Sequence, residues 1–515
     1  MRVGLLTEGG YPYAAGEGGE WCDRLVRGLP RHEFEVYALS RTARQEDSGW
    51  YALPGNVRRV RAAPLWGDPG PGRAGRAHGS YGRRERQRFA EHFTGLAAAL
   101  TAPDSEAYRF AEGLYGLAAL AREEGGLAAG LRSEQALRIL ETACRAPGAH
   151  PAALDTRVAD LLVVSGLLER ALRPLSQDWY GTADGDLGLA RVDLCHAASA
   201  GPAALAGLLA KRFFGTPLLV TEYRVHLRDY YLAAPPGPSP AVRALLSAFH
   251  RALTTEVYAQ AALITPGDAQ VRRWQERCGA DRGRLRTVPP GMDAGLYEAV
   301  GEGTAGGSAG AADDGLTLLG VGGPAEPCLW EAFAALREAE PGLRLRLAGP
   351  AEDPPPERDG VTRADGCGPE DYAAAGVVVL AGAPDGFPVP LAEAMFCGRA
   401  VVAPDAAVVR EVVGGTGLLV PPGDPAALAE ACLALLRDPG RRARLGAAAR
   451  ARALELFTVE QNIAAFGALY LEILSRAPVR QDNPGQAVPF AEAARPRATL
   501  SWSPRAASPT WAGRR

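Results

Sequence analysis

The chain has 515 residues, and such a length favours two or three domains rather than one core. With 47% hydrophobic and 22% charged residues, the composition is that of a globular protein and excludes a disordered chain. The formal net charge of -3 gives no electrostatic basis for nucleic-acid binding.

The first residues alternate strand and helix signals. Val3 to Leu6 is a short apolar run, and it is followed by a glycine-rich loop over residues 9–19, an amphipathic segment over 21–29 and another apolar run over 34–39. This order predicts the start of a doubly wound parallel sheet. The loop lacks the spacing of the dinucleotide and Walker fingerprints, so a phosphate site and a tight turn both explain it. No leader sequence or bilayer-length apolar run is found, which predicts a soluble, cytoplasmic protein.

The predicted domain organisation follows from the later segments. Residues 87–175 are almost wholly helical in pattern, whereas short apolar runs typical of buried parallel strands resume beyond them and again after a small, acidic stretch. We therefore expect an N-terminal Rossmann-like domain over 1–293 with a helical insertion over about 87–175, a flexible linker over 294–314, a second Rossmann-like domain over 315–456, a C-terminal helix over 457–478 and a disordered tail over 479–515.

The expected strands are the short apolar runs of the two domains. In the first domain they are Val3–Leu6, Phe34–Leu39, Asp193–His196, Pro217–Glu222 and Ala262–Thr265, and the pattern continues to 286–293. In the second they are Leu316–Gly320, Leu343–Ala348, Val377–Leu380, Ala400–Ala403 and Gly417–Val420. Ligands of such sheets bind at the carboxyl ends of the strands.

Cysteine and histidine spacing gives no indication of a metal site. The eight cysteines form no CxxC pair, and the seven histidines are dispersed without metal-ligand spacing. Buried free thiols in a reducing compartment are the simpler interpretation. We expect no metal and no bound cofactor.

The most specific segment runs from Asp385 to Asp405. Asp385 and Glu393 lie eight positions apart and frame Gly-Phe-Pro, which turns the chain into a helix expected to begin near Pro390, with Glu393 on its first turn. The N–H groups at such a helix start suit a phosphate or sugar oxygen, and Glu393 suits a ribose diol. A stabilising acidic turn between a strand and a helix explains the same pattern, and spacing alone leaves both interpretations open.

The segment resembles the E-x7-E region of the retaining family 4 glycosyltransferases, which have the GT-B fold of two Rossmann-like domains facing a cleft. Val288–Asp293 is similar to their interdomain segment and Gly417–Pro425 to the loop after their site. Leu6–Tyr13 with Trp21, His196–Gly201 and Leu219–Glu222 more narrowly resemble the Pel exopolysaccharide glycosyltransferase (PelF-like) proteins, which also have a helical insertion.

The resemblance implies a metal-independent transferase that moves a sugar from a UDP-sugar to a glycan or other acceptor, in polysaccharide biosynthesis. The expected partners are the UDP-sugar, a glycan or small-molecule acceptor and a membrane-associated polysaccharide synthase complex. Neither nucleic acid nor a membrane span is expected. The implied catalytic residues are His196, Asp385 and Glu393. The implied donor-binding residues are Gly322, Gly386, Phe387, Pro388, Val389 and Glu393, and the implied acceptor-side residues are Gly16, Glu17 and Glu222.

The sequence departs from that family where the donor diphosphate is neutralised. Gly323 stands where the family has Arg and Cys328 where it has Lys, while Lys211 in the first domain is the only lysine of the chain. Losing such cations removes roughly 3 kcal/mol or more of transition-state stabilisation. Asp385 is also one methylene shorter than the family's Glu.

Three functions therefore remain open. The first is a retaining glycosyltransferase, which Glu393 and His196 favour. The second is a catalytically impaired scaffold or binding subunit of a polysaccharide-assembly complex, which Gly323 and Cys328 favour. The third is another enzyme of the same fold, such as a nucleotide-sugar epimerase. The arginine-rich tail is consistent with a solvated end or with partner binding.

Overall fold

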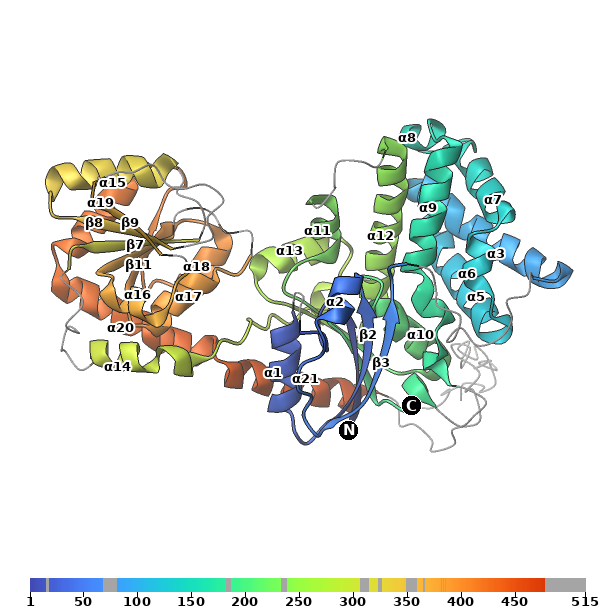
Figure 1. Cartoon of the computed structure of the whole chain (residues 1–515), viewed down its shortest axis with the longest axis horizontal. Helices are drawn as coiled ribbons and strands as arrows, with labels where there is room; N and C mark the ends of the chain where they lie inside the picture. Colours follow the sequence, from blue (N-terminus) through green and yellow to red (C-terminus); the bar gives the residue numbers. More distant parts are fainter. Residues whose placement is uncertain are drawn as a thin grey trace, which may run out of the picture. The chain divides into compact units, whose positions relative to one another are not determined.

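Two six-stranded parallel sheets organise the chain (Figure 1). The computed structural model describes residues 1–14, 18–67, 81–181, 187–232, 239–305, 315–322, 327–348, 359–364, 366–380, 382, 384 and 386–477. Among these residues, no helix is long and apolar enough to cross a membrane. The predicted tail over 479–515 lies outside the described residues.

The first sheet has the strand order β3-β2-β1-β4-β5-β6. Its strands are β1 (Arg2–Glu8), β2 (Glu33–Ser40), β3 (Val57–Pro64), β4 (Leu194–Ala197), β5 (Leu218–Glu222) and β6 (Leu263–Pro266). The central strand β1 pairs in parallel with β2 on one side and with β4 on the other. The chain order therefore reverses between β1 and β4, and such a switch point opens a crevice at the carboxyl edge of a sheet.

The second sheet repeats this plan with the order β12-β11-β10-β7-β8-β9. Its strands are β7 (Thr317–Val321), β8 (Arg344–Ala348), β9 (Val361–Ala364), β10 (Val377–Leu380), β11 (Ala400–Pro404) and β12 (Leu418–Val420). Strand β10 is buried throughout and pairs with β7 and β11, so the switch point lies between β10 and β7. The predicted pair of doubly wound sheets is confirmed, and each gains one edge strand, β3 or β9, that was not expected.

The connection from β3 to β4 holds the helices expected there as an insertion. They are α3 (Arg83–Thr101), α4 (Pro103–Glu106), α5 (Tyr108–Glu124), α6 (Leu127–Leu131), α7 (Glu134–Cys144), α8 (Pro151–Leu154) and α9 (Val158–Ala171), followed by the short 3-10 helices η1 (Arg173–Ser176), η2 (Asp178–Tyr180) and η3 (Gly188–Ala190). Figure 1 shows them gathered beside the long α12 (Pro240–Gln260). Buried aromatic rings join the group, since Phe89 stacks on Phe93 and Phe110 meets Phe249 of α12.

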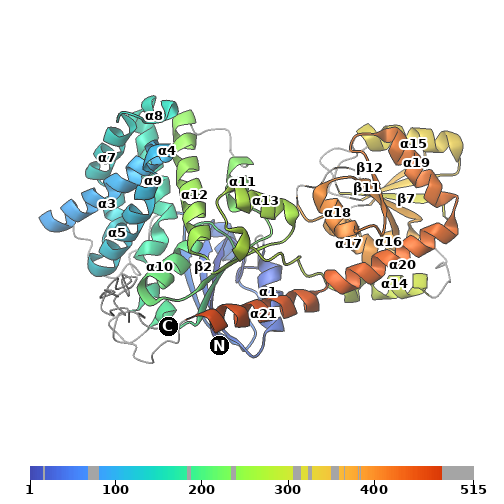
Figure 2. The same cartoon turned by 180° about the vertical axis from the view of Figure 1, so that it is seen from behind.

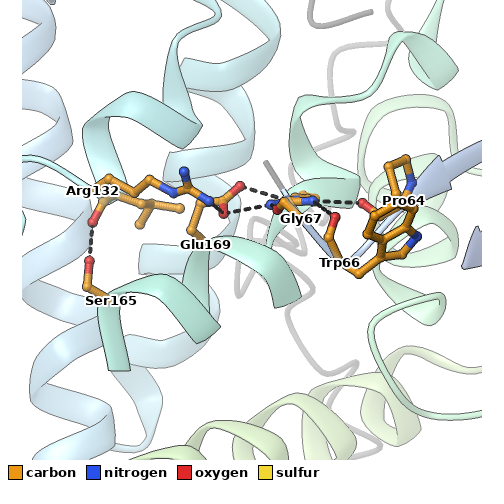
Figure 3. A network of polar contacts seen from close by, with 8 residues as sticks. Pro64, Trp66, Gly67, Arg132, Ser165 and Glu169 are labelled. Carbon is orange, nitrogen blue, oxygen red and sulfur yellow. Dashed lines mark hydrogen bonds and ion pairs between the residues drawn. The ribbon is translucent and has the colours of Figure 1, made fainter. Parts of the chain in front are cut away.

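A buried ion pair fastens this helical group to the end of β3 (Figure 3). Glu169 accepts hydrogen bonds from Arg173 at 2.9 and 3.1 Å and from the more exposed Arg132 at 2.8 Å. The Arg173 guanidinium also donates to the backbone carbonyls of Pro64, Trp66 and Gly67. The Glu169 carboxylate therefore balances the charge of Arg173, and the carbonyls accept hydrogen bonds from its remaining N–H groups, as a buried guanidinium requires.

The remaining helices cover the two sheets. Those of the first are α1 (Gly19–Gly28), α2 (Ala43–Asp47), α10 (Ala204–Phe214), α11 (His226–Leu232), α12 and α13 (Ala269–Arg277), with η4 (Arg282–Arg284). After η5 (Ala294–Tyr297), those of the second are α14 (Glu298–Ala305), α15 (Pro327–Ala339), α16 (Pro369–Ala374), α17 (Val389–Phe396), α18 (Ala407–Val413), α19 (Pro425–Leu436) and α20 (Pro439–Leu456).

The last helix, α21 (Val459–Arg476), returns to the first sheet, and Figure 2 shows it running along α1. Its Thr458 N-cap accepts a hydrogen bond from the Gln461 N–H through the side-chain hydroxyl, which fixes the start of the helix. The apolar face of this helix packs into the core of β1 and α1 through Phe466, Leu469, Tyr470 and Ile473. The outgoing and returning chain segments are joined where Met292 N–H donates to the Phe457 carbonyl at 2.8 Å.

Candidate functional site

A pocket of 840 Å³ opens at the carboxyl edge of the first sheet, at its switch point. Its walls come from the loops after β1, β2, β4 and β5, and from α11 and α12. The lining includes Glu8, Gly9, Tyr11, Trp21, Arg41, Arg44, Gln45, Ser199, Tyr223, Arg224, His226, Asp229, Tyr230 and His250. Aromatic walls with convergent polar groups are typical of a small-molecule site.

Two ion pairs fix charged groups in this pocket. Arg41 Nε lies 3.2 Å from Glu8 Oε1, and Arg224 Nε lies 3.2 Å from Asp229 Oδ2. Arg44 projects from the exposed surface of α2 and also lines the pocket. Because the lining holds three arginines and two carboxylates, its charge favours an anionic group near the mouth.

A pair of histidines forms another part of the wall. His226 Nε2 and His250 Nδ1 are 3.3 Å apart, and the Tyr230 ring lies 4.2 Å from the His250 ring. Burial lowers the pKa of His226 to about 4 and that of His250 to about 3. Both rings are therefore neutral at pH 7 and suit hydrogen bonds with hydroxyl groups. The sequence analysis assigned no role to this pair, because a lone His250 in an amphipathic helix gives no local signal.

His196, for which the family resemblance implies a catalytic role, does not line the pocket. Its ring is completely buried, with Nδ1 2.8 Å from the Tyr470 hydroxyl and Nε2 2.7 Å from the Thr221 hydroxyl. The Trp21 ring, which does line the pocket, meets it edge-on at 5.6 Å. With both nitrogens occupied inside the protein, His196 supports Trp21 and offers no free atom to a substrate in this structure.

Glu222 is likewise a buried acceptor and does not line the pocket. Its carboxylate accepts hydrogen bonds from the Tyr258 hydroxyl, from Gln275 at 3.1 Å, and from the backbone N–H groups of Ala200 and His226. Burial nevertheless raises its pKa. Glu222 thus holds two loops of the pocket wall in place. The other two expected acceptor-side residues, Gly16 and Glu17, lie outside the described residues.

In the second sheet, the expected donor segment begins α17 after β10. The helix starts at Val389, after Pro388 as its N-cap, so Glu393 lies in the second turn. The helix begins near Pro390 as expected, because proline is well accommodated inside a first turn. The expectation that Glu393 lies in the first turn was wrong, since Glu393 is the fifth residue of the helix. Asp385 lies outside the described residues.

The Glu393 carboxylate is held by two tyrosines that the sequence analysis did not identify. Oε1 accepts a hydrogen bond from the Tyr297 hydroxyl at 2.7 Å, and Oε2 accepts one from the Tyr372 hydroxyl at 2.6 Å. Tyr297 comes from η5, four residues beyond Asp293, and Tyr372 comes from α16. Sequence spacing gives no sign of this contact, because the three residues lie 96 and 21 positions apart.

Other expected donor-side residues surround the same sheet edge. Gly322 follows β7 with a φ of 91°, and an added Cβ there would lie 2.5 Å from Leu380, so only glycine fits. The Phe387 ring packs against Phe457 at 5.4 Å, while Val389 is 44% exposed. Cys328 is half-buried in the first turn of α15, and Gly323 lies outside the described residues.

Three arginines of the two sheets are paired with carboxylates. Arg410 binds Asp405 through both carboxylate oxygens, and Arg224 pairs with Asp229 in the pocket of the first sheet. In the second sheet, Arg346 of β8 forms a further ion pair with the buried Asp371. Each guanidinium is therefore partly neutralised by a carboxylate of its own domain.

Two family comparisons cover different parts of the chain. Residues 1–283, more than half of the chain, match the family described as Domain of unknown function (DUF3492). Residues 327–438 match the family described as Glycosyl transferases group 1. The second match includes α17 and Glu393.

Individual relatives extend these matches. The D-inositol 3-phosphate glycosyltransferase of Actinosynnema mirum is 30% identical over 294 residues, which cover 51% of this chain and 69% of that protein. The protein of the same name from Xylanimonas cellulosilytica is 30% identical over 314 residues, covering 53% and 71%. Among solved structures, sucrose-phosphate synthase from Thermosynechococcus elongatus has a TM-score of 0.50 at 18% identity, covering 92% of this chain and 99% of that one. HepE from Anabaena in complex with UDP has a TM-score of 0.50 at 14% identity, covering 92% and 100%.

Proposed function

We propose that this chain, which belongs to the group 1 glycosyl transferases, moves a sugar from a UDP-sugar to a hydroxyl group of an acceptor. The chain has the GT-B fold, and its N-terminal region matches the DUF3492 family. One observation supports this most: the Glu393 carboxylate stands in the second turn of α17, at the carboxyl edge of the second sheet, inside the segment that matches the group 1 family. HepE, which shares the fold, was solved with UDP.

In this proposal the second sheet binds the donor. Glu393 accepts hydrogen bonds from the ribose hydroxyls, and Asp385 contacts hydroxyls of the donor sugar. The backbone from Gly386 to Val389 faces that sugar, and the start of α17 directs N–H groups toward its oxygens. The backbone of Gly322, directly after β7, faces the diphosphate.

The pocket of the first sheet binds the acceptor. Neutral His226 and His250 suit hydroxyl groups, while Arg44 at the mouth suits an anionic substituent. The curated relatives are named for D-inositol 3-phosphate, a phosphorylated polyol, and an acceptor of this chemistry combines both features. We extend the proposal to glycan acceptors in polysaccharide biosynthesis, with Gly16, Glu17 and Glu222 on the acceptor side.

The reaction we propose retains the anomeric configuration and uses no metal. The bond between the anomeric carbon and the donor diphosphate breaks, the acceptor oxygen bonds to the same face of that carbon, and its proton passes to a phosphate oxygen. The protein contributes chiefly by holding the two substrates in position and stabilising the departing charge.

The first test is a thermal-shift titration with UDP, GDP, ADP and UDP-glucose without metal. A ligand at a hundred times its Kd stabilises the folded state by about 2.7 kcal/mol, which is easily measured. A selective shift with UDP is the expected result. A protein that responds to none of these nucleotides would contradict the donor site and favour the scaffold function.

Replacing Glu393 by Ala should weaken UDP binding at least about tenfold, because it removes a charged acceptor worth about 1.5–3 kcal/mol. Isothermal titration calorimetry with UDP measures the change. The matched control is Glu430→Ala, which removes an exposed carboxylate of α19 in the same domain and should leave the affinity unchanged. Equal affinities of wild type and Glu393→Ala would refute the assigned role.

A scaffold function is the second candidate, favoured by the missing Arg and Lys at positions 323 and 328. If the site binds UDP-sugar but is impaired by these losses, the double variant Gly323→Arg with Cys328→Lys should raise UDP release from UDP-glucose roughly tenfold or more. A coupled assay for UDP measures this. No gain in a variant that still binds UDP would indicate that neutralisation of the diphosphate does not limit turnover.

A further inference from the structure

Glu393 lies between two tyrosine hydroxyls that reach it from separate elements. Tyr297 of η5 donates to Oε1 at 2.7 Å, and Tyr372 of α16 donates to Oε2 at 2.6 Å. Each carboxylate oxygen therefore has one charge-assisted hydrogen bond, a strong and directional type of contact. The rotation of the carboxylate about its side-chain bond is fixed by both.

The two phenols are themselves held rigidly. Tyr372 is fully buried and Tyr297 is 7% exposed. The Tyr297 ring stacks on Phe396 at 6.2 Å with an angle of 11° and meets the Tyr372 ring edge-on, while the Tyr372 hydroxyl also lies 3.1 Å from the Pro390 carbonyl. Burial raises the pKa of both tyrosines, so both hydroxyls keep the proton that they donate.

This arrangement leaves acceptor capacity on Glu393. An ionised carboxylate offers about four acceptor positions, and the tyrosines occupy one on each oxygen. One position per oxygen remains, which matches the two vicinal hydroxyls of a ribose. A group ordered before binding loses little entropy when the ligand arrives, so prior orientation increases affinity.

We propose that Tyr297 and Tyr372 are positioning residues that hold the Glu393 carboxylate for the ribose diol and make the site selective for ribonucleotides over 2′-deoxyribonucleotides. The inference rests on the proposed donor site and assigns two residues outside the motif of that site. Tyr297 belongs to the segment that leads from the first sheet to the second, so this segment takes part in nucleotide recognition.

A cycle that combines a protein variant with a ligand variant tests the inference. Calorimetry measures the Kd of UDP and of 2′-deoxy-UDP for the full-length wild type and for Tyr297→Phe. Tyr297→Phe should weaken UDP binding about tenfold, the effect of one charge-assisted hydrogen bond, but 2′-deoxy-UDP binding no more than about twofold. The conservative change keeps the ring and its stacking on Phe396, and the melting temperature without ligand reports whether the fold is intact.

The control is Tyr180→Phe, which removes a buried hydroxyl that donates to the Pro174 carbonyl at 2.6 Å, far along the chain from the donor segment. It should leave both Kd values unchanged. Equal losses for the two nucleotides, or an unchanged Kd for UDP, would overturn the positioning role while leaving the donor site intact. A wild type that binds neither nucleotide would instead overturn the donor site itself.

Discussion

Replacing Glu169 by Ala should lower the free energy of unfolding by about 3–5 kcal/mol, the usual cost of removing one partner of a buried ion pair. The Glu169 side chain is completely buried and that of Arg173 is 3% exposed, with their closest atoms 2.9 Å apart. Without the carboxylate, the Arg173 guanidinium stays among backbone carbonyls but loses the charge that balances it. Urea unfolding at pH 7 measures the change.

A surface pair provides the control for this prediction. Glu134 and Arg138 have the same i,i+4 spacing on α7, but both side chains are about three-quarters exposed. Glu134→Ala should therefore change stability by no more than about 0.5 kcal/mol. Similar losses in the free energy of unfolding for the two variants would show that the buried pair stabilises the fold no more than an exposed pair does. That result would contradict the role given to the network in Figure 3.

The sequence was most informative for strands buried on both faces. Val377–Leu380 is a continuous apolar run and Leu218–Glu222 begins with three apolar residues, and both are strands with the predicted bounds or within one residue of them. The edge strand β3 was missed because Val57–Pro64 contains three arginines, and β9 was missed because Thr362 and Arg363 interrupt its apolar residues. An edge strand needs one apolar face at most, so its sequence lacks the continuous apolar run by which the central strands were recognised.

The candidate site was predictable only as far as local motifs extend. The helix α17, which carries Glu393, follows β10 as expected, because the strand, the Gly-Phe-Pro turn and the helix come one after another in the sequence. Tyr297, Tyr372 and the pair His226–His250 come together through the fold, and no spacing rule connects them. The family resemblance implied roles for His196 and Glu222, and in the structure both side chains are buried and hydrogen-bonded behind the wall of the pocket.

The free energy of unfolding should begin to fall at a pH well above the range in which carboxylates are normally protonated. Burial lowers the pKa of His196 and of His250 to about 3 and that of His226 to about 4. In the unfolded chain each histidine takes up a proton near pH 6.5, whereas the folded protein does so only near pH 3–4. The unfolded state therefore binds more protons in this interval, and the free energy of unfolding falls as the pH falls from about 6.5 to about 4.

Each such histidine should reduce the free energy of unfolding by about 2 kcal/mol between pH 7 and pH 5, and the three together by about 6 kcal/mol. That sum is comparable with the whole stability of an ordinary domain. Glu222 acts in the opposite direction, because burial raises its pKa and the folded protein binds its proton first. The net loss should therefore be smaller than the sum, but still several kcal/mol.

The double variant His226→Gln with His250→Gln separates the histidine contribution from that of the carboxylates. Glutamine does not titrate, so the loss between pH 7 and pH 5 should shrink by about 4 kcal/mol, whatever the stability of the variant at pH 7. Urea unfolding of wild type and variant at several pH values gives both slopes. Because the readout is the difference between two slopes, a general loss of packing cannot imitate it, and parallel slopes would show that the two rings are not kept neutral by the pocket wall.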